Sequence, residues 1–290
     1  MQPHEALSVA GLDPAAVADI VDRAIAEDLD GGVDVTSVAT VDADAVGTLD
    51  LVARARGVTA GAAVAALALA QAAQGRVTCS WIDDGTRVGP GDVVLTASGP
   101  TRDLLLGERT ALNLLGHLSG IATATRQWVD ALGDSPTRVR DTRKTTPGLR
   151  RLEKYAVRCG GGVNHRMSLS DAALVKDNHV VSAGGVAAAF ARVREAFPGV
   201  PVEVEVDSLD QLDEVLVAGA DLVLLDNFTP DQMREAVRRT AGRAQLEASG
   251  GLTLADASAV GATGVDFVAV GALTHSAPVL DIGADLREAQ

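Results

Sequence analysis

The chain has 290 residues, of which 25 are Lys or Arg and 39 are Asp or Glu, so its formal net charge is −14. This length suits one large α/β domain or two modest ones, and a hydrophobic fraction of 47% is ample for a core. A nucleic-acid binder would present a basic stripe with stacking aromatic side chains, whereas this chain is acidic and 2% aromatic. Composition therefore argues against nucleic acid as a partner.

The cysteine count and the first residues bear on the compartment. Cys79 and Cys159 are too few for a disulfide framework, so a reducing cytoplasm is the simplest location. No basic segment followed by an apolar core opens the sequence, so we expect no signal peptide. Residues 57–75 carry no charge, but Ala, Gly and Gln dominate them. We therefore expect an Ala-rich helix of a soluble protein there, and no membrane span.

The first 132 residues combine helical and strand patterns. Periodicity predicts helices at 15–28 and 101–132, and alternation predicts strands at 47–56, 76–82 and 92–98. Within the long helix, Gly116 and Gly120 mark points of close packing or a kink. This part of the chain is predicted to form a separate layer of helices and meandering strands.

The pattern changes near residue 137, where short apolar runs begin to alternate with helical segments. The runs lie at 137–144, 172–179, 202–208, 221–228, 244–251 and 265–272. Strand and helix repeating at intervals of roughly 20 residues are typical of a parallel sheet. About six such units favour a β/α barrel or partial barrel over an open doubly wound sheet.

Each of these runs ends in polar, ionisable or glycine residues. The endings include Arg143-Lys144, Lys176, Glu205, Asp226, Ser249-Gly250-Gly251 and Gly271-Ala272. The carboxyl ends of the strands of a parallel barrel converge on one mouth, where such folds place their sites. Six endings of this kind predict a functional site at that mouth.

The carboxylates are the first component of this site. Glu203, Glu205 and Asp207 share one face of a predicted strand. An edge strand with a solvated face would explain the alternation, whereas a covered strand would need cations opposite inward carboxylates. Glu205 and Asp226, on neighbouring strands, would form a sparse oxygen site suited to Mg²⁺. The sequence has no His/Cys spacing for zinc.

Glycine turns at 249–251 and 270–272 are the second component. Each would leave backbone N–H groups free at a helix N-terminus, which is an anion site, although a Gly-Gly pair also fits a simple turn. The absence of GxxxxGK[ST] and GxGxxG argues against an ATPase or a dinucleotide-binding fold.

A basic cluster at 140–166 is the third component, with eight of the 25 Lys and Arg residues. Those predicted to cradle carboxylates and phosphates, together with Lys176 from the next run, are Arg143, Lys144, His165 and Arg166. Those at helical spacing, predicted to lie on a solvated helix face or an interface, are Arg150, Arg151, Lys154 and Arg158. His117, inside an apolar helix, is interpreted as a core histidine with its hydrogen bonds satisfied. The residues alone thus indicate a Mg²⁺-assisted reaction on a phosphorylated, carboxylated small molecule.

Three motifs carry a family resemblance: DTRKTTPGLR at 141–150, KYAVRCGGGVNHR at 154–166 and LVKDNH at 174–179. In this order they resemble quinolinate phosphoribosyltransferase, and ERTALNLLGHLSGIAT at 108–123 fits the same family. The resemblance implies that quinolinate and phosphoribosyl pyrophosphate are joined, with Mg²⁺, to give nicotinate mononucleotide, pyrophosphate and CO₂.

The resemblance also implies an architecture. An N-terminal α/β sandwich domain, residues 1–115, would be followed by an incomplete parallel β/α barrel over 116–275, with 276–290 packing back on the first domain. The protein would be a cytoplasmic homodimer, or a higher oligomer built from it, with no membrane or nucleic-acid partner.

Site residues follow from the same resemblance. Arg109 would reach the site from the partner subunit, and Lys144, Lys176, Glu205 and Asp226 would be catalytic. Substrate carboxylates and phosphates would meet Thr142, Arg143, Lys144, His165, Arg166 and Lys176. Glu205 and Asp226 would hold Mg²⁺ and the ribose hydroxyls, and the 5′-phosphate would bind Ser249, Gly250, Gly251, Val270, Gly271 and Ala272.

Three other functions stay open at this stage. A class I aldolase-like enzyme would use Lys176 as a Schiff-base nucleophile. A phospho-ligand sensor could use the same scaffold without catalysis, although it need not keep metal ligands and leaving-group cations together. A paralogue with a changed substrate would keep the phosphate half of the site, and nicotinate would need fewer cations than Arg109, Arg143 and Arg166 provide.

Overall fold

The computed structural model describes residues 2–288, which form two compact units. The first contains the described residues up to 124, together with 146–160 and those from 276 on. The second contains 125–145 and 161–275. The chain thus leaves the second unit after residue 145 and returns to it at Gly161.

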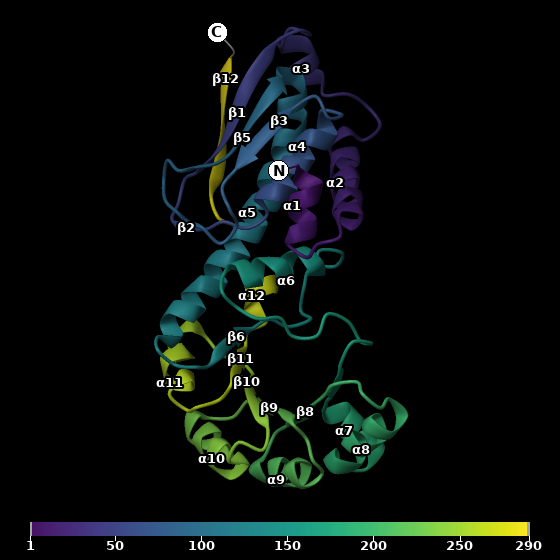
Figure 1. Cartoon of the computed structure of the whole chain (residues 1–290), viewed down its shortest axis with the longest axis vertical. Helices are drawn as coiled ribbons and strands as arrows, with labels where there is room; N and C mark the ends of the chain where they lie inside the picture. The colour runs from purple at the N-terminus through teal and green to yellow at the C-terminus, as the bar shows by residue number, and fades with distance from the viewer. Residues whose placement is uncertain (1, 289–290) are drawn as a thin grey trace. The chain divides into compact units, whose positions relative to one another are not determined.

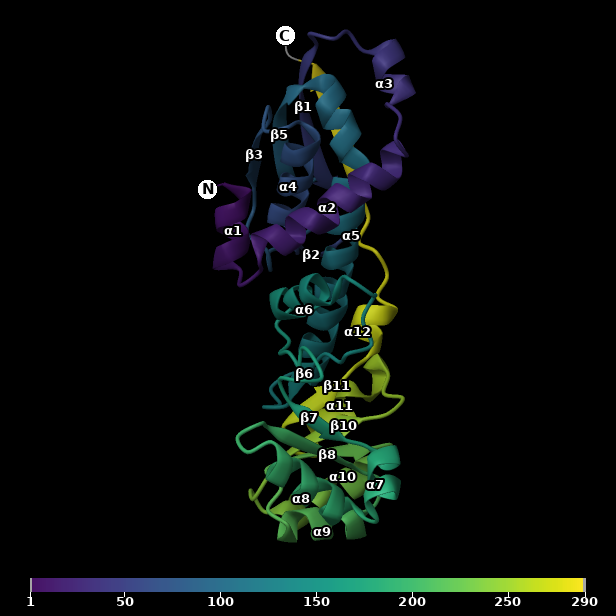
Figure 2. The same ribbon diagram turned by 90° about the vertical axis from the view of Figure 1, so that its right-hand side faces the viewer.

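The first unit is built on a four-stranded antiparallel sheet with strand order β12-β1-β5-β3. The strands of this sheet are β1 (Val46–Ala53), β3 (Thr78–Trp81), β5 (Val93–Pro100) and β12 (Ile282–Glu288). Strands β2 (Gly57–Val58) and β4 (Arg87–Val88) form a separate two-stranded sheet. Its helices are α1 (Pro3–Val9), α2 (Pro14–Leu29), α3 (Val35–Thr40), α4 (Ala62–Ala72), α6 (Arg150–Cys159) and most of α5 (Thr101–Leu132). Figures 1 and 2 show α4 lying over the sheet, where it packs against β3 and β5.

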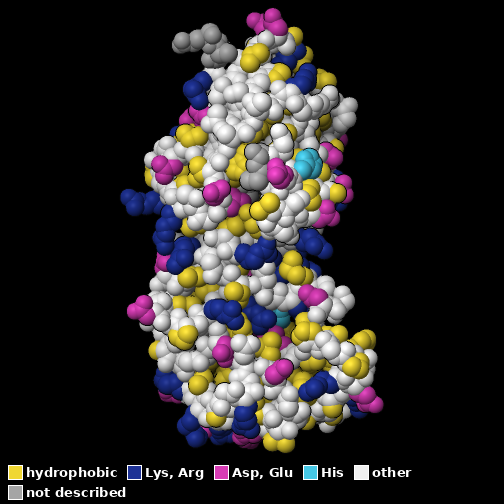
Figure 3. All heavy atoms as spheres, viewed as in Figure 1, with side chains coloured by type: hydrophobic (Ala, Val, Ile, Leu, Met, Phe, Trp, Pro, Cys, Tyr) yellow, Lys and Arg dark blue, Asp and Glu magenta, His cyan; other side chains and the backbone are white. Residues whose placement is uncertain are grey.

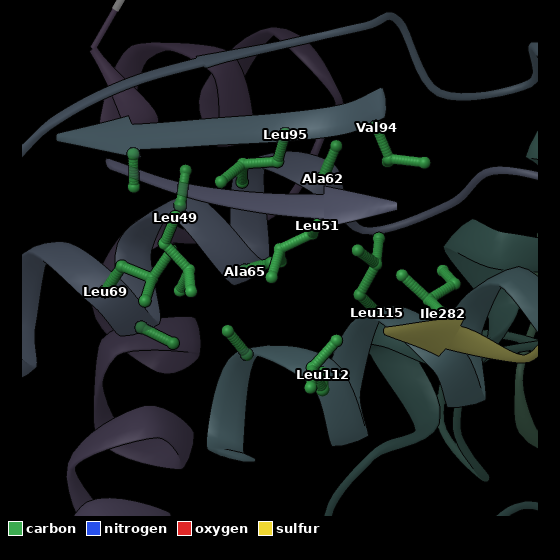
Figure 4. Packing of buried hydrophobic residues seen from close by; sticks show 14 of the residues in the cluster. Leu49, Leu51, Ala62, Ala65, Leu69, Val94, Leu95, Leu112, Leu115 and Ile282 are labelled. Atoms are coloured by element: carbon green, nitrogen blue, oxygen red, sulfur yellow. The ribbon is translucent and has the colours of Figure 1, made fainter. Parts of the chain in front are cut away.

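The core of this unit lies between the sheet and helices α4 and α5. Leu49, Leu51 and Leu95 project from the strands toward Leu69 and Leu115 of these helices (Figure 4). Nearly all of α4 is buried, which confirms the predicted Ala-rich helix. Among the described residues, no helix is long and apolar enough to cross a membrane.

The glycines of α5 explain how the returning C-terminal segment packs. A Cβ atom on Gly120 would lie 2.1 Å from the carbonyl oxygen of Pro278, and one on Gly116 would lie 2.9 Å from Val279 Cγ1. Both distances are closer than side chains tolerate, so only glycine admits this segment. The predicted close packing at Gly116 and Gly120 is confirmed.

One prediction about the basic cluster is wrong. Arg151 and Arg158 are exposed on α6, but Lys154 is fully buried together with Glu153. Helix α6 buries a whole flank of residues around these two positions. The helical spacing of charged residues predicts which of them lie on the same face of a helix. It does not predict how much of the helix surface is buried by neighbouring elements.

The second unit contains a six-stranded, all-parallel sheet with order β6-β11-β10-β9-β8-β7. The strands are β6 (Arg138–Arg140), β7 (Ala173–Val175), β8 (Val202–Val206), β9 (Leu222–Asp226), β10 (Gln245–Ser249) and β11 (Phe267–Ala269). The helices are α7 (Asp177–Ala183), α8 (Val186–Ala196), α9 (Leu209–Val217), α10 (Pro230–Thr240), α11 (Ala257–Gly261) and α12 (Ala272–His275), with a 3₁₀ turn at Leu254–Asp256. Figure 1 shows α8, α9 and α10 on the outer side of these strands.

This strand order is that of a barrel in which the first and last strands do not pair, so the barrel is not closed. Strands β7 to β11 are neighbours in chain order, and β6 pairs with β11, but β6 and β7 do not pair with each other. At the gap, β6 instead forms a parallel bridge, Arg140 to Val163, with the returning segment of the chain. The predicted incomplete parallel barrel is confirmed, and the doubly wound alternative is excluded.

The position of β8 decides how its carboxylates are interpreted. The strand lies between β7 and β9, so the edge-strand explanation is wrong. Val204 is fully buried on one face, and Glu203 is only 3% exposed on the other. The inward carboxylates therefore require cations nearby.

Candidate active site

A cavity of about 660 Å³ lies in the second unit at the carboxyl ends of the parallel strands. The predicted residues that line it are Thr142, Arg143, Lys144, His165, Arg166, Lys176, Glu205, Asp226, Ser249, Gly250, Gly251, Val270, Gly271 and Ala272. Several Lys and Arg side chains, with a His side chain among them, are visible on this part of the surface in Figure 3. Seven separate segments of the chain thus contribute to one cavity.

Lys144 packs against the glycine turn that follows β11. Its backbone N–H donates to Thr142 Oγ1 at 3.0 Å, and its carbonyl oxygen accepts from Thr274 Oγ1 at 2.9 Å. A Cβ on Gly271 would lie 3.0 Å from Lys144 Cδ, so the absence of a side chain there makes room for the lysine stem. The aliphatic part of the Lys144 side chain therefore lies beside the turn at 270–272.

Two guanidinium groups meet in the cavity. Burial and the nearby Arg143 lower the pKa of Arg166, whose Nη1 donates to the carbonyl oxygen of Ala172 at 3.0 Å. Nε of Arg143 is buried without a hydrogen-bond partner among the described residues. Because like charges repel when both are desolvated, an anion bound between them would relieve the repulsion.

Glu205 and Asp226 end neighbouring strands, as the sequence predicted. Lys176 Nζ forms an ion pair with Glu205 Oε2, and Asp226 Oδ2 accepts from Asn227 Nδ2 at 2.8 Å. Two carboxylates at neighbouring strand ends are a donor set that fits Mg²⁺, which commonly binds one or two carboxylates, waters and substrate phosphates. The residues present therefore suit the expected ion.

The turn after β10 is shaped by a second close approach. Gly250 and Gly251 have φ angles of +98° and +60°, and a Cβ on Gly250 would lie 2.3 Å from Asn227 Oδ1. The N–H groups of Gly250, Gly251, Gly271 and Ala272 have no acceptor within residues 2–288. Free amides at two adjacent turns form a site for an oxyanion.

We expect Gly250→Ala to raise KM for a phosphorylated substrate by tenfold or more, on the order of the 1–3 kcal/mol that such backbone strain costs. The new methyl group must push Asn227 or the turn away. Gly251→Ala is the matched control, because nothing lies within 4 Å of its Cβ position. Steady-state kinetics should show the larger effect at position 250, and equal effects at both positions would contradict this assignment.

A layer of buried charge lies beneath the cavity. Arg140 Nη1 lies 2.7 Å from Glu247 Oε2, and His165 Nε2 lies 2.7 Å from Glu203 Oε2. Burial, reinforced by the Glu203 carboxylate, raises the pKa of Glu247 to about 8, although Arg140 opposes the shift. Glu247 lines the cavity, but sequence reasoning missed it, because QLEAS reads as an ordinary strand with one polar face.

Two other predicted residues lie in the first unit. Arg109 is on α5 with a side chain that is 63% exposed, 3.8 Å from Glu108 Oε1, and it does not line the cavity. His117 Nε2 lies 2.9 Å from Glu153 Oε1, and Glu153 also accepts from the backbone N–H of Thr146. The His117 side chain is 28% exposed, so its predicted place in the core is wrong, whereas a hydrogen-bond partner for Nε2 is confirmed.

A cationic cavity with carboxylates at one end and free amides at another, at the mouth of a partial β/α barrel, belongs to an enzyme. Its lining suits a small molecule that carries both phosphate and carboxylate groups.

Comparison with known proteins specifies the family. The family model for the quinolinate phosphoribosyl transferase C-terminal domain matches residues 121–285, and that for the N-terminal domain matches 34–119. A nicotinate-nucleotide pyrophosphorylase (carboxylating) from Mycobacterium leprae is 51% identical over 276 residues, which cover 93% of this chain and 97% of the relative. A probable enzyme of the same name from Bacillus subtilis is 43% identical and covers 82% of each chain.

Solved structures agree with these matches. NadC from Streptococcus pyogenes superposes with a TM-score of 0.92 at 41% identity, covering 96% of this chain and 99% of that one. The nicotinate-nucleotide pyrophosphorylase from Francisella tularensis gives a TM-score of 0.89 at 36% identity, with coverage of 94% and 96%. The chain belongs to the quinolinate phosphoribosyl transferase family.

Proposed function

We propose that this protein transfers the phosphoribosyl group of phosphoribosyl pyrophosphate to the ring nitrogen of quinolinate, a step of de novo NAD biosynthesis. Loss of CO₂ then gives nicotinate mononucleotide, and pyrophosphate is the other product. Support comes from the family and from one observation: Arg143 and Arg166 converge in a cavity that is also lined by two glycine turns with free backbone amides. Quinolinate, with two carboxylates, matches this cationic end.

The residues suggest how the reaction is assisted. Arg143 and Arg166 would bind the two carboxylates and aim the ring nitrogen at the anomeric carbon, which lowers the entropic part of the barrier. Lys144 lies beside the turn at 270–272 and would stabilise negative charge that builds on the departing pyrophosphate. The positive charge on the new pyridinium nitrogen would stabilise the electron pair that departing CO₂ leaves on the adjacent ring carbon. That carbon would then take a proton from water, so CO₂ loss requires no strong protein acid.

Glu205 and Asp226 would hold Mg²⁺ and the ribose hydroxyls. When bound, the ion supplies positive charge to the pyrophosphate oxygens. Lys176 is ion-paired with Glu205 in this structure, so the lysine and the ion would share one carboxylate. The same ion pair argues against an aldolase-like role, because a charged ammonium group is not nucleophilic.

The test is one incubation with quinolinate, phosphoribosyl pyrophosphate and Mg²⁺ that follows CO₂ and nicotinate mononucleotide together. We expect equal amounts of both products, loss of activity without Mg²⁺ and no product when nicotinate replaces quinolinate. Turnover of nicotinate instead would favour a paralogue with a changed substrate. Ligand binding without any turnover would favour a sensor.

We further propose a cytoplasmic homodimer in which Arg109 of each copy completes the site of the other. The support is that Arg109 is exposed and lies outside the cavity of its own chain, while the cationic cavity suits one more guanidinium.

Arg109→Ala and Arg166→Ala should each be nearly inactive alone, yet regain activity when mixed. A mixed dimer would contain one doubly damaged site and one intact site, so random exchange restores about a quarter of wild-type activity. The measurement is activity after subunits are dissociated and reassembled in equal amounts. No recovery, with heterodimers demonstrated by mass spectrometry, would place Arg109 in its own chain's site.

A further inference from the structure

The chain that links Arg166 to β7 forms a turn that closes on itself twice. The Arg166 side chain reaches the far end of the turn, where Nη1 donates to the carbonyl oxygen of Ala172 at 3.0 Å. The carboxylate of Asp171 reaches back in the other direction. It accepts from the backbone N–H of Met167 at 2.6 Å and from that of Ser168 at 3.0 Å. Two side chains, one basic and one acidic, thus hold the ends of this turn together.

The carbonyl group that receives Arg166 is anchored to the parallel sheet. The backbone N–H of Ala173, the first residue of β7, donates at 2.8 Å to the carbonyl oxygen of Pro201, which directly precedes β8. The N–H and C=O groups of a trans peptide bond lie in one plane and point in opposite directions. The carbonyl oxygen of Ala172 is therefore turned away from Pro201 and toward Arg166.

Asp171 determines the path of the turn between these two ends. Its Oδ1 also accepts from Ser168 Oγ at 3.2 Å, whereas Leu169 at the tip is 72% exposed and contributes little packing. Burial would raise the pKa of Asp171, but the N–H groups of Met167 and Ser168 lower it below its ordinary value. The carboxylate is therefore ionised at neutral pH, when hydrogen bonds to it are strongest. Without these bonds, the turn would gain conformational freedom.

Arg166 needs a fixed turn because its surroundings oppose its charge. Burial and the nearby Arg143 lower the pKa of Arg166, although the Asp171 carboxylate opposes the shift. Without an anion in the cavity, a loose turn would let the Arg166 guanidinium move away from Arg143 toward water. Asp171 does not line the cavity, so its effect on a bound substrate would pass through Arg166.

We propose that Asp171 is a positioning residue for quinolinate binding, which closes the turn after Arg166 and so holds the guanidinium group at the carbonyl oxygen of Ala172. This inference rests on the proposed function, because quinolinate is the ligand that Arg166 would bind. A guanidinium group has five N–H donors, so the one given to Ala172 leaves others for a substrate carboxylate.

Kinetics of two Asp171 variants test the inference. Asp171→Ala removes both acceptor oxygens and should raise KM for quinolinate about tenfold or more, while KM for phosphoribosyl pyrophosphate stays within about twofold. Asp171→Asn keeps one amide oxygen for a backbone N–H and should recover part of that loss. Both variants remove the same negative charge. A role of charge alone would therefore lower KM for the dianionic quinolinate equally in both.

Asp13→Ala is the matched control. Asp13 is an exposed carboxylate of the first unit that accepts from the backbone N–H of Ala15 at 3.0 Å. Its loss removes the same charge and a similar hydrogen bond outside the cavity, and we expect no change in either KM value. Wild-type turnover of quinolinate is measured first, and its absence would reject the proposed function.

With turnover established, three results would overturn the inference alone: the same KM change in the Ala and Asn variants, an unchanged or lower KM for quinolinate in Asp171→Ala, or equal rises in both KM values. If Asp171→Ala fails to fold, Ser168→Ala decides, because Ser168 Oγ accepts from the backbone N–H groups of Ser170 and Asp171 at 3.2 Å in the same turn. A rise of about threefold or more in KM for quinolinate alone supports the inference, and no selective rise overturns it.

Discussion

Arg166→Ala is expected to weaken quinolinate binding about a hundredfold while KM for phosphoribosyl pyrophosphate changes little. Removing one partner of a buried, hydrogen-bonded charge pair typically costs 2–5 kcal/mol, which makes about a hundredfold a conservative figure. Arg166 is half-buried, and burial and the nearby Arg143 lower its pKa, so substrate carboxylates bound between the two guanidinium groups would offset an unfavourable interaction. The measurement is a pair of KM values together with direct titration of quinolinate.

The matched control is Arg234→Ala. Arg234 is exposed on α10 and paired with Asp231, so its loss changes the net charge by the same amount without touching the cavity. An exposed pair of this kind contributes roughly 0–1 kcal/mol, and we expect no change in either KM value. Equal weakening of both substrates by Arg166→Ala would contradict its assignment to the carboxylate end.

Glu247→Gln is expected to stabilise the protein above pH 8 and to have little effect near pH 5. The folded state raises the pKa of Glu247 from 4.5 to about 8, so it retains a proton that the unfolded chain has lost. Stability from this group is therefore complete below pH 4.5, falls as pH rises, and is fully lost above about pH 8. At about 1.4 kcal/mol per pKa unit, the total loss is on the order of 5 kcal/mol.

Three carboxylate oxygens of Glu203 and Glu247 have no hydrogen-bond partner within the described part of the chain, which fits a retained proton. Glutamine resembles the protonated acid and cannot ionise, so the variant should not lose this part of its folding stability as pH rises. The measurement is the free energy of unfolding of wild type and variant from pH 5 to 9. A difference between them that stays constant with pH would show that Glu247 does not titrate in this range.

Strand ends were the most predictable part of the site. A short apolar run in a β/α pattern ends at a definite edge, so Lys176, Glu205, Asp226 and Gly250 could be placed at one mouth without knowledge of any contact. The long helix at 101–132 was also predictable, because its periodicity is uninterrupted over the full length of α5.

The buried charge layer could not be predicted in the same way. In the sequence, Arg140 is one more residue of a basic cluster, and Glu247 is one polar residue of a predicted strand. Their ion pair could not be predicted, because it joins β6 to β10 across the strand between them. The prediction that Lys154 is solvated was wrong for a related reason, since burial of a charged side chain depends on neighbours that are distant in sequence. Arg109 stays a prediction, because its proposed partner is a second copy of the chain.

The chain between β6 and β7 leaves the second unit and returns to it. Residues 146–160, which belong to the first unit, follow Lys144 and precede His165 in the sequence, so Arg143 and Arg166 flank this segment. A dianion that bridges them would tie the ends together and lower the conformational freedom of everything in between. Amide hydrogen exchange in α6 should therefore slow when quinolinate binds. This helix does not line the cavity, yet its exchange rate would show whether the cavity is occupied.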